Sequence, residues 1–464
     1  MLICNSVFHF PQSDIIGALI LTGLFAVVVG GIEAAARNGR LGTETARKAV
    51  HVVGGLGCAL FPFLVQSWIT VAVLASLFAV VFYLGESRGM LRALSGVERK
   101  SRGALYFPVA IFVVFLFGNE RLWLYFAALF TLVLADTAAA MAGIRFGRLR
   151  FRTETNGEKS LEGTLAFGLV GFFTVLVPML LLSDFSVLTC VLTALLMALL
   201  LAGLEGLSVG GTDNLFVPLG VVFLILKIPT KPPLEIAFQI GSLVAIAFVF
   251  FLLNRKWHML PVKTFVTFVL VSYSAWSLGS VEWMLPLLGG FVIYNVLCSV
   301  CVDQEHDFRN RLVLIPLLPA LIILYWANAR MTLDFWFAPF LATVTVVASL
   351  SVMTRFYVMP GNMPPTFTRL VLAWILPVVV CMGSWFVQGN AVLQAIPPLL
   401  LLNASAMGIY RLYCRGKFAL LFGVPWGYVV AALAASAGLL YAAAETLGWI
   451  EPLQPFTWKG IFRE

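Results

Sequence analysis

Residues 163–204 read GTLAFGLVGFFTVLVPMLLLSDFSVLTCVLTALLMALLLAGL. Asp184 is the single charged residue in this stretch, and it separates two long apolar runs at 163–182 and 186–204. A helix needs about 20 apolar residues to cross the ~30 Å hydrocarbon core of a bilayer. The stretch therefore predicts two successive transmembrane helices that are joined by a short turn.

The rest of the chain has the same character. Of its 464 residues, 61% are hydrophobic and 11% are charged, and the mean hydropathy is +0.98. Globular domains have about 45–50% apolar and about 25% charged residues, so this composition excludes a soluble protein as well as a disordered chain. We predict an all-α polytopic integral membrane protein with about 16 transmembrane helices, about nine in the first half and seven in the second. The expected spans are 14–34, 48–65, 67–85, 104–119, 121–142, 163–182, 186–204, 214–228, 235–253, 262–281, 283–301, 312–327, 334–353, 367–387, 391–410 and 424–446.

The basic residues support this order of helices and give it an orientation. With the N-terminus outside, 24 of the 30 Lys and Arg residues fall in connections on the inner side. Since basic residues concentrate in cytoplasmic loops, we expect the loops at 86–103, 143–162 and 203–213 in the cytoplasm. The net charge of +8 then reflects membrane topology and requires no nucleic-acid partner. The six basic residues expected outside are Arg121, Lys227, Lys231, Arg330, Lys459 and Arg463.

A boundary near residues 254–261 divides the chain into two parts. Residues 1–253 contain long inner loops in which glycines and charged residues are interleaved. Residues 254–464 have short connections and are expected to form a second helical bundle. The roles open to this second bundle are to shape a lipid cavity, to form an oligomer or to carry a second activity.

The second half has one charge-rich loop, at 303–311. Cys298 and Cys301 precede this loop and His306 lies within it, so a zinc site is one interpretation. The other interpretation is two thiols at a helix end beside a solvated loop. The seven cysteines are scattered, mostly within apolar runs, and therefore predict no disulfide framework.

Two cations and an imidazole open the second expected helix. His51 follows Lys48 by three residues and Arg47 by four, so all three side chains can share one helix face. Such a face can bind phosphate. The alternative is a simple membrane anchor on the cytoplasmic side with an incidental histidine.

Asp136 lies within an otherwise apolar span. A carboxylate at membrane depth costs roughly 2.5–3.5 kcal/mol on insertion scales, so it is usually paired or functional. Small residues follow at 137–143, which lets a ligand or another backbone approach closely. The structural alternative is an ion pair between Asp136 and a buried arginine that joins two helices.

The loop after this span combines glycines with basic residues. Backbone N–H groups and fixed cations together suit a phosphate cradle, although the spacing of a Walker loop is absent. The alternative is a basic loop that binds anionic lipid headgroups. The residues that carry the phosphate prediction are Gly143, Arg145, Gly147, Lys159, Ser160 and Gly163.

The loop at 205–214 contains no Lys or Arg. Glu205, Asp213 and Asn214 supply the hard oxygen ligands that Mg²⁺ requires. An acidic loop among basic loops on the same side is typical of a metal–phosphate site. The alternative is a helix cap formed by Asp213.

Four motifs occur in order along the first half. They are R-K-x-x-H at 47–51, A-D-T-A-A-A-x-x-G-x-x-F-G at 135–147, E-K-S-L-E-G-T at 158–164 and E-G-x₆-D-N-x-x-V-P at 205–218. Over residues 15–253 the chain thereby resembles the phytol kinase and dolichol kinase family of CTP-dependent polyprenyl-alcohol kinases. It departs from the family at Ala135 and Thr137, where glycines usually flank the aspartate, and at Thr212, where the family usually has a second aspartate.

The resemblance implies an integral membrane kinase that transfers the terminal phosphate of CTP to an isoprenoid alcohol, such as phytol or dolichol, at the cytoplasmic face. It implies Mg²⁺ held by Asp136 and Asp213, with Glu205 and Asn214 as further ligands or around them. Lys159 and the arginines at 145–152 would hold the nucleotide phosphates. The remaining expected roles are for Glu162, which would orient Lys159, and for Arg47, Lys48 and His51, which would contact phosphate or activate the alcohol.

Two other functions remain open from the sequence. A transporter or flippase would suit the many spans, although ionisable groups gathered at one face favour an enzyme. A cytidylyltransferase of the phosphatidate type would use the same nucleotide and metal but would release pyrophosphate. The expected partners are a nucleoside triphosphate, an isoprenoid alcohol and membrane lipids, and an oligomer is left open.

Overall fold

Helices make up nearly all of the chain that the structure describes. The computed structural model describes residues 12–87, 103–152, 158–208, 211–257, 262–298, 306–358, 367–382, 390–415, 426–450 and 453. In this part, nine helices are long and apolar enough to cross a membrane, and shorter apolar helices occupy most of the other expected spans. The prediction of an all-α polytopic membrane protein is confirmed.

The chain divides into two compact units. Unit 1 is Met1–Ile240 and unit 2 is Gly241–Glu464. The boundary lies within helix α12 (Pro233–Trp257), and the boundary expected from the sequence, between residues 253 and 254, falls in the same helix.

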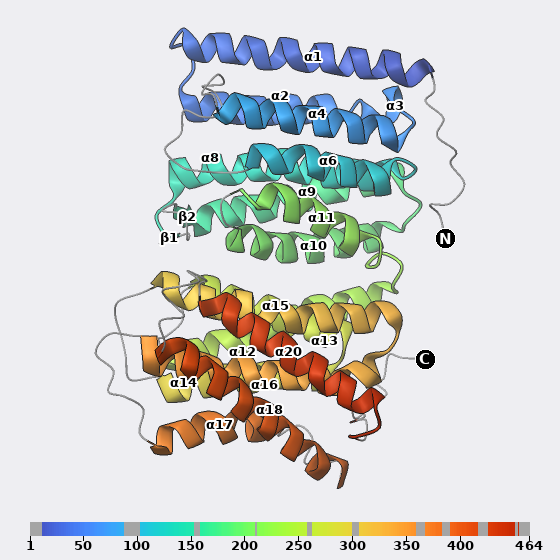
Figure 1. Cartoon of the computed structure of the whole chain (residues 1–464). Helices are drawn as coiled ribbons and strands as arrows, with labels where there is room; N and C mark the ends of the chain where they lie inside the picture. Colours follow the sequence, from blue (N-terminus) through green and yellow to red (C-terminus); the bar gives the residue numbers. More distant parts are fainter. Residues whose placement is uncertain are drawn as a thin grey trace. The chain divides into compact units, whose positions relative to one another are not determined.

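The helices of unit 1 lie side by side, with α1 at one edge beside α2 and α4 (Figure 1). A small antiparallel hairpin, β1–β2, joins α8 to α9 and pairs Phe151 with Lys159. The elements are α1 (Gln12–Arg37), α2 (Thr43–Cys58), α3 (Phe61–Leu64), α4 (Trp68–Ser87), α6 (Gly103–Gly118), α7 (Leu122–Phe130), the π-helix η1 (Thr131–Ala135), α8 (Asp136–Phe146), β1 (Arg150–Arg152), β2 (Glu158–Ser160), α9 (Leu161–Leu182), α10 (Val187–Leu207) and α11 (Asp213–Ile225).

Side-chain caps begin the two helices that the opening stretch predicts. The Ser160 hydroxyl accepts a hydrogen bond from the Gly163 N–H at the start of α9, and the Ser186 hydroxyl accepts one from the Thr189 N–H at the start of α10. A serine in this position satisfies one of the backbone N–H groups that have no partner within the first helical turn. The sequence thus begins α9 directly after strand β2, which fixes where Lys159 lies.

A π-helical turn interrupts the span that carries Asp136. Helices α7, η1 and α8 follow one another from Leu122 to Phe146, and η1 ends at the residue before Asp136. Single π turns are frequent at functional sites. The carbonyl of Leu132, within this turn, accepts a hydrogen bond from the His51 ring at 3.1 Å, and so α2 is bound to η1.

A buried carboxylate fixes the start of α1. Asp14 is fully buried and accepts hydrogen bonds from the N–H groups of Gln66 at 2.9 Å and Ser67 at 2.8 Å, and from the Thr70 hydroxyl at 3.0 Å. These partners belong to the connection between α3 and α4 and to the first turn of α4. Asp14 therefore has a structural role, because it joins α1 to the α3–α4 connection and to α4.

Unit 2 surrounds helix α16 (Leu333–Val358). This helix packs against α14, α15, α17, α18 and α20, and 89% of its membrane-length segment is buried. Helix α16 also forms polar contacts with its neighbours. The Asn403 amide of α18 donates a hydrogen bond to the Ser349 hydroxyl of α16 at 2.7 Å. The predicted zinc site includes Cys301, which lies outside the described residues. Besides α12, the other described helices of unit 2 are α13 (Val262–Leu278), α14 (Val281–Cys298), α15 (His306–Arg330), α17 (Phe367–Cys381), α18 (Asn390–Arg415) and α20 (Trp426–Thr446).

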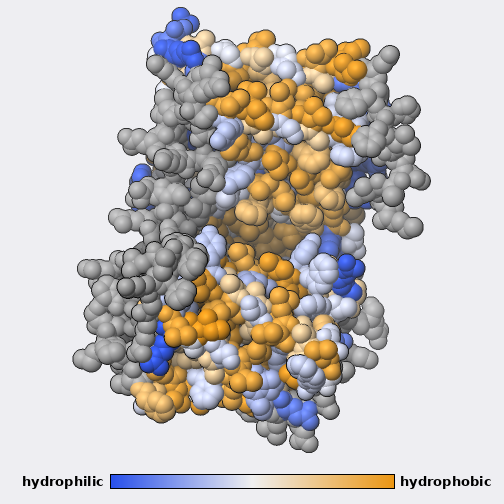
Figure 2. All heavy atoms as spheres, in the orientation of Figure 1, coloured by the Kyte–Doolittle hydropathy of each residue, from blue (hydrophilic) through white to orange (hydrophobic). Residues whose placement is uncertain are grey.

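Hydrophobic side chains cover much of the visible surface along the helices of each unit (Figure 2). Examples on α9 and α10 are Leu169, Leu181 and Val187, with exposed fractions between 63% and 75%. Helix α1 has a mean hydropathy of 2.6 and only 11% of its span is buried. Lipid is the solvent that such surfaces require.

Candidate active site

Asp136 forms the centre of a first charged cluster. Lys48 of α2 donates to its Oδ2 at 2.6 Å, and the Nε2 atom of His51 lies 3.6 Å from the same oxygen. The side chains of Lys48, His51 and Asp136 are 13%, 11% and 18% exposed. The ion-pair partner of Asp136 is thus Lys48, a lysine predicted to bind phosphate. The structural alternative expected a buried arginine in this place.

Lys159 forms the centre of a second cluster. Its Nζ atom donates to Glu205 Oε1 at 2.6 Å and to the Ser208 hydroxyl at 2.6 Å, and it also donates to the Glu205 carbonyl. Asp213 Oδ2 lies 3.5 Å from the same Nζ atom. The Lys159 ammonium of strand β2 is thus close to carboxylates at the end of α10 and at the start of α11.

Further hydrogen bonds fix the two carboxylates of this cluster. The Thr164 hydroxyl donates to Glu205 Oε2 at 3.1 Å, and the Ser208 hydroxyl donates to Asp213 Oδ2 at 3.0 Å. Thr164 and Ser208 lie inside two of the four motifs, but neither is expected as a site residue. Hydroxyl groups carry no charge, and only the folded chain shows that these two reach the carboxylates.

Asp213 does not act mainly as a helix cap. It is the first residue of α11, and its Oδ1 accepts a hydrogen bond from the adjacent Asn214 N–H at 3.1 Å. Its Oδ2 instead faces Lys159 and Ser208. The Asn214 amide is buried and donates to the Gly103 carbonyl at 3.1 Å, which binds α11 to the first residue of α6.

Electrostatics connect the two clusters into one site. Burial by itself would lower the pKa of the Lys159 ammonium, but the carboxylates of Glu205 and Asp213 outweigh burial and raise this pKa above its ordinary value. The Asp136 carboxylate adds to the same rise. Lys159 therefore stays charged at neutral pH, and carboxylates from both clusters act on it.

Glu162 does not orient Lys159 as the sequence analysis expects. Its Oε1 atom accepts hydrogen bonds from the N–H groups of Arg148 at 3.0 Å and Leu149 at 3.1 Å. The side chain lies in the first turn of α9 and reaches back to the connection after α8, whereas Glu205 and Ser208 hold Lys159. Glu162 thus closes the 147–149 turn onto the start of α9.

The predicted phosphate-binding glycines lie where α8 crosses α9. A Cβ atom at Gly163 would lie 2.8 Å from the Ala139 carbonyl, and one at Gly143 would lie 3.1 Å from the Ser160 hydroxyl. A Cβ atom at Gly147 would lie 2.2 Å from the Gly143 carbonyl. Close helix packing is sufficient reason for these residues, and their contact with phosphate stays a prediction.

Apart from Arg47, the predicted phosphate-binding arginines with described side chains are more exposed than the two lysines. Arg47 is half-buried on α2 beside Lys48. Arg145 is exposed, and its guanidinium lies 5.5 Å from the centroid of the Phe146 ring. Arg148 and Arg150 are also exposed. The two lysines of the clusters are thus paired and half-buried, whereas Arg145, Arg148 and Arg150 are exposed.

Comparison with known proteins addresses the resemblance drawn from the four motifs. The chain is 34% identical over 210 residues to a phytol kinase from Synechocystis sp., and this match covers 88% of that protein. The chain belongs to the phytol kinase family. The match covers 43% of the chain, so more than half of it lies outside the part shared with this phytol kinase. No protein-family model and no solved structure matches the chain.

Proposed function

We propose that the protein transfers the terminal phosphate of CTP to the hydroxyl group of an isoprenoid alcohol at the cytoplasmic face of the membrane. The observation that carries this proposal is the joined Lys48–Asp136 and Lys159–Glu205 site in a member of the phytol kinase family. The choice of CTP rests on the family resemblance. The choice of face rests on the 24 of 30 basic residues that fall on one side of the expected topology.

The charges of the site suit a triphosphate. Phosphoryl transfer depends mainly on positioning and on neutralisation of phosphate charge. Lys48 and Lys159 are fixed cations within the site. Arg47 directly precedes Lys48 on α2, and Arg145 is exposed in the last turn of α8. Carboxylates hold both lysines in place, so the cations are oriented before the nucleotide arrives.

The same carboxylates fit Mg²⁺. Glu205 and Asp213 lie 2.6 and 3.5 Å from the Lys159 ammonium, and Asp136, which pairs with Lys48, acts on Lys159 electrostatically, so all three carboxylates favour positive charge in this region. Within the described residues, no group of three or more His, Cys, Asp or Glu side chains is arranged to hold an ion by itself. Mg²⁺ commonly takes one or two carboxylates together with phosphate oxygens, and we assign Asp136 and Asp213 as ligands, supported by Glu205 and Asn214. The bound ion would neutralise phosphate charge.

The transfer forms one bond and breaks another. The hydroxyl oxygen of the alcohol bonds to the terminal phosphorus, and the bond from that phosphorus to the bridging oxygen breaks, which releases CDP. We assign the hydroxyl proton to the His51 ring. Since the Leu132 carbonyl can only accept, His51 donates through Nε2, and Nδ1 is then the acceptor nitrogen of a neutral ring.

Incubation of the purified full-length protein with CTP, Mg²⁺ and a panel of isoprenoid alcohols tests the proposal. We expect an isoprenyl monophosphate and CDP in equal amounts, and slower transfer with ATP. A CDP-lipid with pyrophosphate would indicate a cytidylyltransferase instead. The absence of nucleotide-dependent product with every alcohol would contradict the kinase assignment.

A further inference from the structure

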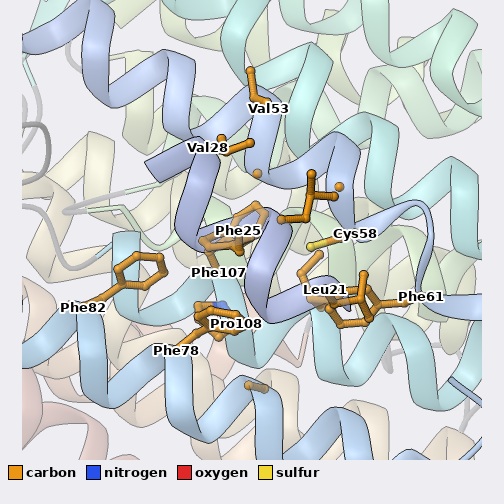
Figure 3. A pocket seen from close by; sticks show the side chains of 15 residues that line it. Leu21, Phe25, Val28, Val53, Cys58, Phe61, Phe78, Phe82, Phe107 and Pro108 are labelled. Carbon is orange, nitrogen blue, oxygen red and sulfur yellow. The ribbon is translucent and has the colours of Figure 1, made fainter. Parts of the chain in front are cut away.

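An apolar pocket lies among α1, α2, α3, α4 and α6 (Figure 3). Its cavity volume is about 30 Å³, and it is partly open to the surroundings. Five aromatic rings dominate its wall: Phe25 of α1, Phe61 of α3, Phe78 and Phe82 of α4, and Phe107 of α6. All fifteen lining residues are Leu, Phe, Val, Ile, Ala, Gly, Pro or Cys, so the pocket offers a ligand neither a charged group nor a hydroxyl.

Helix α2 leads from the charged site into this pocket. Lys48, His51, Gly54 and Gly57 follow one another at intervals of three residues, and each interval shifts the position by about 60° around the helix, so Gly57 lies on the side opposite Lys48. Lys48 and His51 contact Asp136, whereas Gly54 and Gly57 line the pocket. The distance along the helix axis from Lys48 to Gly57 is about 13 Å at about 1.5 Å per residue.

His51 also contacts the pocket wall directly. Its ring packs edge-on against Phe107, with 5.3 Å between the ring centroids. His51 therefore stands between Asp136 on one side and an aromatic residue of the pocket on the other. A ligand with one polar end and one apolar chain would meet both environments in this order.

The two glycines of α2 that line the pocket differ in their surroundings. A Cβ atom at Gly54 would lie 3.0 Å from the Phe25 ring, so this glycine lets the ring pack against α2. A Cβ atom at Gly57 would meet nothing nearer than the Leu24 side chain, at 3.9 Å. Protein interiors are normally packed without such unfilled space, since each void loses dispersion contacts. The pocket is also not sealed, because Leu24 and Val53 of its lining are 40% and 43% exposed. A chain longer than the pocket can therefore continue into the surrounding lipid.

We propose that this pocket receives the first isoprene units of the acceptor alcohol and directs its hydroxyl group toward His51 and Asp136. This inference rests on the proposed function. A branched, unsaturated chain matches the aromatic wall, and along α4 the pocket extends from Ala75 to Phe82, about 10 Å at about 1.5 Å per residue. The polar end of the ligand then lies where the phosphate would be delivered.

Photolabelling tests the place of binding without requiring transfer. The probe is geranylgeraniol with a diazirine on the isoprene unit nearest to the hydroxyl, added to the full-length protein in phosphatidylcholine nanodiscs. We expect the label on peptides of α1, α2, α4 or α6 that line the pocket. We also expect unlabelled geranylgeraniol to prevent labelling, whereas the excess phosphatidylcholine of the disc does not. Label confined to other helices, or a signal that geranylgeraniol does not displace, would overturn the proposal.

A matched pair of glycine substitutions tests the pocket in the reaction. Gly57→Leu fills the pocket from α2, whereas Gly23→Leu adds the same side chain on α1 at a position outside the lining, where a Cβ atom meets nothing within 4 Å. We expect Gly57→Leu to raise the KM for geranylgeraniol at least about tenfold and to leave the KM for CTP within about twofold. Gly23→Leu should change neither value.

Ala75→Leu provides a second filling variant, from α4, in case Gly57→Leu does not fold. A normal KM for geranylgeraniol in a folded filling variant would overturn the pocket assignment, even if the protein proves to be a kinase. Displaceable labelling of the pocket without any phosphate transfer would instead support the pocket and contradict the proposed function. The experiments can therefore contradict the pocket assignment and the proposed function independently of each other.

Discussion

The Nζ atom of Lys48 lies 2.6 Å from Oδ2 of Asp136, although 88 positions separate the two residues in the sequence. This ion pair joins the start of α2 to the start of α8. It unites the first and second motifs of the family pattern in one place. It also explains how a carboxylate can lie within an apolar span, because an opposite charge and a nearby imidazole stabilise it.

Lys159→Met should lower kcat/KM for CTP by about a hundredfold, because the variant loses the cation that Glu205 and Asp213 hold in the site. Lys231→Met is the matched control. Lys231 also pairs with a glutamate, Glu235, but both side chains are about one-third exposed, and such pairs contribute only about 0–1 kcal/mol. Steady-state kinetics on folded protein decide the question, and equal kcat/KM values for the two variants would contradict the role of Lys159.

Chelation of divalent cations should abolish transfer, and added Mg²⁺ should restore it. Asp213→Asn should raise the Mg²⁺ concentration for half-maximal rate by about tenfold or more, because the change removes one charged ligand. Asp184→Asn, in the exposed turn between α9 and α10, is the control and should leave this concentration unchanged. Full activity of the wild type after complete chelation would exclude the metal.

Asp14→Asn should destabilise the protein without affecting the chemistry. Asp14 is buried and accepts three hydrogen bonds at the turn between α3 and α4, far along the sequence from the site motifs. An amide cannot accept all of these bonds in the same arrangement, so we expect a loss of about 1–3 kcal/mol in the free energy of unfolding. Thermal melting and turnover per folded molecule test this, and a large fall in turnover with unchanged melting would contradict it.

Arg148→Cys and Asp184→Cys should differ in their labelling by an impermeant thiol reagent in intact cells. Both positions are exposed, and helix α9, which is long enough to span the membrane, separates them. The expected topology places Arg148 in the cytoplasm and Asp184 outside. We therefore expect labelling at position 184 and protection at position 148 until the cells are permeabilised. The reverse labelling pattern would show that the orientation in the membrane is opposite to the expected one.

Much of the fold is predictable because hydropathy alone places the helices of a membrane protein. The span expected at 163–182 is α9 at Leu161–Leu182, and its two additional residues follow from the Ser160 cap. The span expected at 48–65 is interrupted, since α2 ends at Cys58 and the short α3 begins at Phe61, directly before Pro62. The β1–β2 hairpin is absent from the prediction because each of its strands has only three residues.

The sequence marks candidate residues for the site, but it does not show their partners. A carboxylate in an apolar span and a Lys–Ser pair beside glycines indicate a functional site, because these residue types are unusual in such surroundings. The sequence contains no sign that Lys48 pairs with Asp136 or that Glu205 holds Lys159, because these contacts depend on how distant helices pack. The π turn before Asp136 and the pocket beside His51 arise from the same packing, and no local pattern marks either of them.

Asp136→Asn tests the central claim most directly, by turnover per folded molecule and melting temperature measured on the same preparation. The substitution keeps the shape of the side chain and removes the charge that faces Lys48 and His51. We expect the protein to fold and the rate of phosphate transfer to an isoprenoid alcohol to fall by about a thousandfold, which corresponds to about 4 kcal/mol in transition-state stabilisation. Near-normal turnover per folded molecule, with a lowered melting temperature, would show that Asp136 only joins α2 to α8 and would contradict the active site described above.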